Sequence, residues 1–192
     1  MKRILKKHTL VIMGLATLIA FPFLAWLLLF FIPESFQISF KTMFQIKSSD
    51  CILIPLFLSI GILFGLVVIW LTELNYFEKA MTKYRNMLDG YKLTLFHVIF
   101  LSICAGVGEE VFFRGTIQPL IGIVLTALFF VVIHGYFSFK NKRVNIFAVL
   151  LTLFIVLIGW AAKEYSIWQA ISAHFSYDLV LLFYYRSISK SS

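Results

Sequence analysis

The sequence predicts an all-α, polytopic membrane protein with about six transmembrane helices and one cytoplasmic interfacial helix. Of the 192 residues, 61% are hydrophobic and 14% are charged, and the mean hydropathy is +0.94. Soluble domains are only about half apolar. A hydrocarbon core of about 30 Å requires about 20 apolar residues of helix, and six apolar stretches of suitable length lie between charged or turn-rich breaks. We therefore expect one membrane domain over residues 1–192, with multi-pass insertion in the cell membrane.

The first two predicted spans cover residues 10–32 and 51–72, and neither contains a charged residue in its interior. The basic start "MKRILKK" followed by an apolar run resembles a signal peptide. However, the run is too long for a signal-peptide core, and no small-residue cleavage site follows it. We therefore expect an uncleaved first span. After the second span, "ELNYFEKAMTKYRNMLDGYK" mixes apolar and charged residues, which predicts the interfacial helix.

Four further spans are predicted in the second half of the chain. The third begins near Leu93, and the fourth to sixth cover residues 122–139, 144–162 and 167–185. Pro119 and Gly122 separate the third span from the fourth, and both residue types end helices readily. We therefore expect these two spans to form a hairpin.

The distribution of basic residues predicts the orientation of the chain. Lys and Arg concentrate at the N-terminus, in 79–92, at 140–143 and near the C-terminus, and alternating spans place all four segments on one side. The other side keeps Lys41, Lys47 and Lys163 between its spans. Both termini are therefore predicted to be cytoplasmic. The net charge of +8 fits contact with the lipid bilayer, so we expect no nucleic-acid partner.

The stretch "GVGEEVFFRG" at 106–115 brings three charges into the third span. At about 2.5–3.5 kcal/mol for each charge at a helix centre, Glu109, Glu110 and Arg114 together cost roughly 8–10 kcal/mol. One interpretation places them at the headgroup level as a cluster at a helix end. Alternatively, they have partners inside the bundle. Glu110 and Arg114 are four residues apart and can form an ion pair, whereas Glu109 lies about 100° around the helix.

Two later motifs provide candidate partners for Glu109. "FVVIH" places Phe130 and His134 four residues apart, and "HFSYD" does the same for His174 and Asp178. Glu109 and His134 each lie about 12 residues from the predicted turn, so both should lie roughly 18 Å from it. His174 and Asp178 enter from the same side and reach a similar depth. We therefore expect these side chains to converge within the membrane.

Such a cluster predicts hydrolytic chemistry. Glu109 can take a proton from water, and a nearby His134 can share it. His174 with Asp178 can either complete a metal site or polarise a substrate carbonyl group. A divalent metal such as zinc would require Glu109, His134 and His174 as ligands at about 2 Å and would leave Glu110 as the base. The metal-free alternative, which we favour, uses Glu109 as the base.

These motifs resemble those of the CaaX-protease and bacteriocin-processing family of intramembrane proteases, which are E-E-x-x-x-R, F-x-x-x-H and H-x-x-x-N or D. "GTIQPL" after Arg114 resembles the family's continuation, and the similarity covers about residues 96–185. The resemblance implies that Glu109 and His134 activate water, that Glu110 and Arg114 support the site, and that His174 and Asp178 stabilise the oxyanion. An ionised Asp cannot donate a hydrogen bond as Asn does, so Asp178 could instead orient His174.

The sequence thus predicts an intramembrane endopeptidase with a catalytic core over about 93–186 and a membrane-associated peptide or protein as substrate. The short chain resembles family members that process peptides or confer self-immunity to bacteriocins. Two alternatives remain: a non-catalytic membrane immunity or binding protein, and a proton-coupled transporter. The lack of an internal repeat argues against the transporter. His97, about 18 Å from Glu109 along the same helix, is expected to be a packing or interfacial residue.

Overall fold

The computed structural model describes residues 7–34, 41–77, 91–139 and 141–189, and the regular structure within these ranges is helical, without strands. The elements are α1 (Lys7–Leu29), α3 (Asp50–Glu73), α5 (Leu95–Phe112), the π-helix η1 (Phe113–Ile117), α6 (Gln118–Ile121), α7 (Ile123–Ile133), α8 (Lys142–Glu164) and α9 (Ile167–Ser189). The predicted all-helical class is confirmed. The predicted interfacial helix falls largely on 78–90, outside the described residues.

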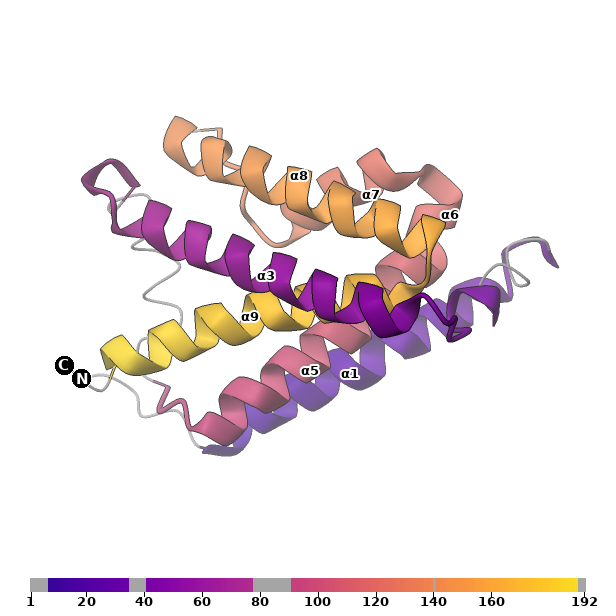
Figure 1. Cartoon of the computed structure of the whole chain (residues 1–192), viewed down its shortest axis with the longest axis horizontal. Coiled ribbons are helices and arrows are strands. Elements are labelled where there is room, and N and C mark those ends of the chain that lie inside the picture. Colours follow the sequence, from indigo (N-terminus) through magenta and orange to yellow (C-terminus); the bar gives the residue numbers. More distant parts are fainter. Residues whose placement is uncertain (1–6, 35–40, 78–90, 140, 190–192) are drawn as a thin grey trace.

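The long helices run back and forth along one direction (Figure 1). The beginning of α1 and the end of α9 lie at the same end of the bundle, as the predicted topology requires. Four helical stretches of the described chain are long and apolar enough to cross a membrane: His8–Leu29, Asp50–Glu73, Leu95–Ile121 and Lys142–Glu164. The chain is a multi-pass membrane protein.

The outward surfaces of these helices are apolar. Ile19 of α1, Leu63 of α3 and Leu153 of α8 each expose more than 60% of their surface. A soluble monomer rarely exposes large apolar patches, whereas lipid covers them without cost. The exposed faces therefore account for the high hydropathy of the whole chain.

Helix α9 occupies the predicted sixth span, but it is more polar than the four stretches named above. It contacts α3, α5 and α8, and its polar side chains Gln169, Ser172, His174 and Ser176 are buried between them. Polar residues in a membrane protein face the interior of the bundle because lipid cannot bond to them. The lower hydropathy of α9 thus reflects its central position.

Two glycines let α3 approach α9 closely. A Cβ atom added at Gly61 would lie 2.1 Å from the carbonyl oxygen of Ala173, and one at Gly65 would lie 3.0 Å from Cβ of Val180. The spacing G-x-x-x-G places both glycines on one face of α3, which is a common arrangement where membrane helices cross. At the start of both helices, Asp50 accepts hydrogen bonds from Gln169 Nε2 at 2.7 Å and Ser166 Oγ at 3.2 Å. These contacts hold α9 in register with α3.

The fourth predicted span, 122–139, differs from the structure. Helix α7 has only 11 residues, about 16 Å of helix, which is too short to cross the bilayer. It ends because Gly135 adopts a left-handed conformation with φ of 74°. The N–H group of Tyr136 donates to the carbonyl oxygen of Val131 at 3.2 Å, and that of Gly135 donates to Val132 at 3.0 Å, which together form a Schellman motif.

His97 has a structural role, in agreement with its predicted assignment. It is buried in the first turn of α5, where its backbone N–H group donates to Oγ1 of Thr94 at 3.2 Å. The ring nitrogen Nδ1 lies 3.2 Å from the backbone nitrogen of Thr94. This reciprocal pair is a capping box, which satisfies two donors at the helix start.

Candidate active site

Glu109 and His134 face each other between α5 and the end of α7. Glu109 Oε2 lies 3.3 Å from His134 Nε2, and the two side chains are 12% and 28% exposed, respectively. The predicted equal depth of these residues across the turn is therefore present in the structure. Both side chains are therefore partly exposed rather than sealed inside the bundle.

The end of α7 orients His134. The residue is the C-cap of the helix, and its Nδ1 lies 2.7 Å from the carbonyl oxygen of Phe130. Its ring also stacks on that of Phe130, with the centroids 4.0 Å apart. Because a carbonyl oxygen only accepts hydrogen bonds, Nδ1 carries a proton and Nε2 points at Glu109. The contact between Nε2 and the carboxylate then needs one proton, held by either residue.

Glu110 lies in a different environment from Glu109. Its side chain is fully buried and accepts a hydrogen bond from Arg114 Nε at 2.7 Å. Its other oxygen lies 2.8 Å from His174 Nδ1. The predicted pair with Arg114 is present, and the contact with His174 is additional. Glu110 thus links α5 to α9 at the centre of the bundle.

A polar chain continues from this pair into α8. Arg114 Nη1 donates to Gln118 Oε1 at 3.1 Å, and Gln118 Nε2 donates to the carbonyl oxygen of Gly159 at 2.9 Å. Arg114 lies in the π-helix η1, which ends directly before Gln118, and the N–H group of Gln118 is directed at the carbonyl oxygen of Phe113, five residues earlier. Short π-helical segments often occur at functional sites. Within this motif, the side chains of Glu110, Arg114 and Gln118 therefore form one buried network.

His174 contacts both the buried Glu110–Arg114 network and the cavity. Besides Glu110, it faces Asp178, with 3.6 Å between His174 Nε2 and Asp178 Oδ2. Glu109, His134, His174 and Asp178 all line one cavity of about 100 Å³, together with the apolar walls Phe130, Leu151 and Ile155. The structure thus brings together four of the predicted site residues around the cavity and places Glu110 and Arg114 behind them.

A glycine permits this convergence. A Cβ atom added at Gly106 would lie 3.1 Å from both the backbone nitrogen and Cβ of Phe175. Gly106 is one helical turn before Glu110, and Phe175 follows His174, so the close approach of α5 and α9 occurs beside the Glu110–His174 contact. A larger residue at 106 would separate the two helices.

The predicted zinc ligands do not form a metal site here. Within the described ranges, no group of three His, Cys, Asp or Glu side chains is arranged to hold a metal ion. His174 Nδ1 is engaged by Glu110, and Nε2 lies 3.6 Å from Asp178. The set Glu109, His134 and His174 therefore does not fit zinc in this geometry.

Three side chains of this site were not among the residues predicted from the sequence. Tyr136 and Tyr177 line the cavity, and Gln118 extends the buried network. Gln118 was signalled only by the resemblance of "GTIQPL" to the family continuation. Tyr136 follows the helix-ending Gly135, and Tyr177 precedes Asp178, so neither belongs to a helical i, i+4 pair with the motif residues.

The family model of the type II CAAX prenyl endopeptidase Rce1-like proteins matches residues 91–180. Over these residues the chain is similar to that family. The matched segment contains all six predicted site residues, and the Rce1-like family is one of proteases. Neither a curated protein nor a solved structure matches the chain.

Proposed function

We propose that this Rce1-like chain is an intramembrane endopeptidase in which Glu109 activates water to hydrolyse a peptide bond of a membrane-associated protein or peptide. The observation that carries the proposal is the 3.3 Å contact between Glu109 and His134 at a partly exposed cavity inside a helical bundle. A carboxylate and an imidazole that share one proton can transfer it during hydrolysis.

The reaction follows from these positions. Glu109 takes a proton from water while the water oxygen bonds to the carbonyl carbon, and the carbonyl electron pair moves to oxygen. His174 Nε2, whose contact with Asp178 is long at 3.6 Å, is placed to donate a hydrogen bond to this oxyanion. When the C–N bond breaks, the proton held by the Glu109–His134 pair passes to the leaving nitrogen. Asp178 orients His174 and does not itself bind the oxyanion.

A second cavity supports a membrane-associated substrate. It measures about 280 Å³, is lined mainly by apolar residues of α1, α5 and α9, and shares Tyr136 and Asp178 with the catalytic cavity. An apolar part of a substrate can occupy this space while the scissile bond lies beside Glu109. The biological setting that we propose, peptide processing or self-immunity to bacteriocins, rests on the family resemblance and the short chain. Cytoplasmic termini are proposed from the distribution of Lys and Arg.

Cleavage of a labelled membrane peptide by the purified chain tests this function. We expect Glu109→Ala and His134→Ala each to lower kcat/KM about 10²–10⁴-fold, the usual contribution of a positioned acid or base. The matched control is Glu164→Ala, because Glu164 is exposed and lies outside the cavity, and its rate should equal that of the wild type. Unchanged cleavage in both site variants would contradict the proposal.

Two further arms of this experiment separate the alternatives. Activity that is lost with a chelator and restored by zinc would replace the metal-free reaction with a metal-dependent one. Protection of cells from a bacteriocin by Glu109→Ala at the wild-type level would assign a non-catalytic binding role instead. We expect chelator-resistant cleavage and loss of any protective effect in Glu109→Ala.

A further inference from the structure

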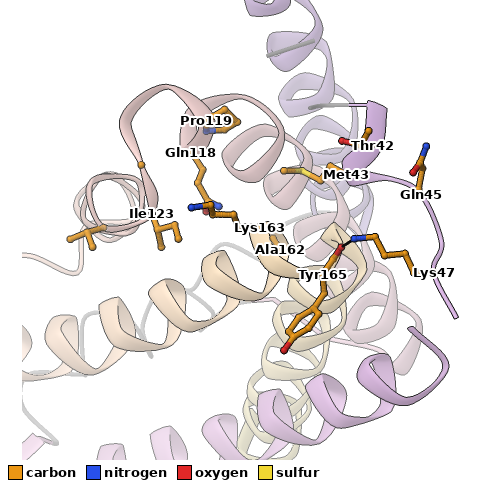
Figure 2. Close-up of a pocket in the computed structure, with 12 residues that line it drawn as sticks. Thr42, Met43, Gln45, Lys47, Gln118, Pro119, Ile123, Ala162, Lys163 and Tyr165 are labelled. Atoms are coloured by element: carbon orange, nitrogen blue, oxygen red, sulfur yellow. Dashed lines mark hydrogen bonds between the residues drawn. The ribbon is translucent and has the colours of Figure 1, made fainter. Parts of the chain in front are cut away.

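A large cavity lies away from the candidate active site. It measures about 770 Å³ and lies between segment 42–47, the turn from α6 to α7 and the end of α8 (Figure 2). This is the end of the bundle opposite the beginning of α1 and the end of α9 (Figure 1). It shares no lining residue with the catalytic cavity. We call it the outer pocket.

The charges of the outer pocket have a single sign. Among the described residues that line it, the charged ones are Lys47 and Lys163. Lys47 donates to the carbonyl oxygen of Tyr165, which fixes its ammonium group at the wall of the pocket (Figure 2). The nearest buried carboxylate, Asp50, already accepts hydrogen bonds from Lys47 N, Ser166 and Gln169. The pocket therefore favours an anionic ligand.

The rest of the lining is apolar and continues onto the lipid-facing surface. Met43, Pro119, Ile123 and Ala162 form much of the wall. Val124 also lines the pocket and is 57% exposed, and its neighbour Leu125 is equally exposed. Leu120 and Ile121 expose 45% and 43% of their surface on α6. An anionic ligand with an apolar tail can thus keep its charge at the lysines and its tail on α6 and α7.

We propose that the outer pocket binds an anionic phospholipid, with its phosphate group at Lys47 and Lys163 and an acyl chain along Val124 and Leu125. Basic pockets between membrane helices hold lipid headgroups in this way. A free phosphate ion would use the lysines but gain nothing from the apolar wall. The orientation predicted from the basic residues places the pocket in the outer leaflet.

The bound lipid would also contact the network behind the active site. Gln118 lines the outer pocket and, at the same time, accepts a hydrogen bond from Arg114, the partner of Glu110. A ligand that fills the pocket would restrict the movement of Gln118. The lipid site itself does not depend on the proposed peptidase activity, and its test measures binding alone.

Native mass spectrometry of the purified full chain in an uncharged detergent tests the proposal. The probes are phosphatidylglycerol, which is anionic, and phosphatidylcholine with the same acyl chains, which has no net charge. We expect one phosphatidylglycerol to bind in preference to phosphatidylcholine. In the double variant Lys47→Gln, Lys163→Gln, affinity for phosphatidylglycerol should fall about thirtyfold, which corresponds to about 2 kcal/mol for two lysines.

Single substitutions at an exposed lysine distinguish a loss of lipid binding from a loss of folding. Lys163 is exposed, so Lys163→Gln should fold normally and lose about fivefold in affinity, and Lys163→Arg should retain binding. Lys41→Gln is the matched control, since Lys41 is an exposed lysine that does not line the pocket. Equal phosphatidylglycerol binding by wild type and Lys163→Gln would overturn the proposal.

Two competitors distinguish the source of the anion. Glycerol 3-phosphate carries the phosphate without acyl chains, and an apolar peptide with a free C-terminal carboxylate carries a different anion. We expect neither to displace phosphatidylglycerol at equal concentration. Displacement by glycerol 3-phosphate would show that the apolar wall contributes nothing, and displacement by the peptide would assign the pocket to a peptide; either result contradicts the lipid assignment.

Discussion

Glu109 and Glu110 are adjacent in the sequence but belong to two regions of the bundle that differ in burial and in partners. Glu110 is fully buried and contacts both Arg114 and His174. Glu109 is 12% exposed, lines the cavity and contacts His134 at 3.3 Å. The rotation of about 100° between successive helical residues produces this difference.

The comparison shows how one helix can hold structural and reactive charge in a membrane. In a buried ion pair whose carboxylate oxygens both have hydrogen-bond partners, each charge depends on the other. Removal of one partner leaves an uncompensated buried charge. A carboxylate with one imidazole partner and access to water can instead exchange its proton. The following changes test this division, beginning with the one expected to have the largest effect.

Arg114→Met should destabilise the protein most. The fully buried Glu110 would lose its ion pair, which costs about 3–5 kcal/mol when the other charge stays buried. The thermal unfolding midpoint in detergent measures this change. Arg143→Met is a control on the more exposed start of α8 and should have a much smaller effect. An unfolding midpoint of Arg114→Met equal to that of the wild type would show that the pair does not support the bundle.

Gly106→Val should have the next largest effect, since it places side-chain atoms where α5 touches Phe175 of α9. Overfilling of such a contact costs about 1–3 kcal/mol. The substitution should also lengthen the Glu110–His174 contact and reduce cleavage. Unfolding midpoints and cleavage rates of purified variants measure both effects. Normal cleavage by Gly106→Val would show that the geometry of the site does not depend on the contact between α5 and α9 at this position.

Gly135→Ala tests the turn that presents His134. Gly135 has a left-handed conformation, in which a residue with a Cβ atom is less stable by about 1–2 kcal/mol. No heavy atom lies within 4 Å of the added Cβ, so the loss of stability should come from the backbone alone. The unfolding midpoint should fall modestly, and Gly135→Asn should fall less because Asn tolerates this conformation better. Equal losses for Ala and Asn would contradict this explanation.

Asp178→Asn should have the smallest effect. The contact between Asp178 and His174 is long at 3.6 Å, and Asp178 is 23% exposed. Asn can still accept a hydrogen bond from His174 and can donate one to the oxyanion. We expect kcat/KM to stay within about tenfold of the wild type, a change below about 1.4 kcal/mol. A loss above a hundredfold in a folded variant would give the carboxylate a direct role.

The sequence predicted the helical class, the turn near Pro119 and the level positions of Glu109 and His134. These depend on local rules, namely hydropathy, helix-breaking residues and a rise of 1.5 Å per residue. The span predicted over 122–139 extends past the end of α7. Tyr136, Phe137 and Phe139 continue the apolar pattern after Gly135, so hydropathy alone does not show that the helix ends there. The glycine that follows His134 indicates this helix end, because helices commonly end with a glycine directly after the C-cap residue.

The contact of Glu110 with His174 could not be predicted from spacing within one helix. It depends on how closely α5 approaches α9, and that distance is set by Gly106 against Phe175. Spacing predicted the pairs Glu110–Arg114 and His174–Asp178 because each lies within a single helix. To predict a contact between two helices, one must know how each helix is oriented about its own axis. The amino-acid composition does not define this orientation.

A paired measurement of Glu109→Gln and Glu110→Gln tests the central claim most directly. The two substitutions are chemically identical and one residue apart, and each variant is assayed for thermal unfolding and for peptide cleavage. We predict that Glu109→Gln keeps the unfolding midpoint of the wild type and loses about 10²–10⁴-fold in kcat/KM, whereas Glu110→Gln leaves Arg114 unpaired and lowers the unfolding midpoint. Wild-type cleavage by Glu109→Gln, or equal unfolding midpoints in the two variants, would contradict the division between the two glutamates.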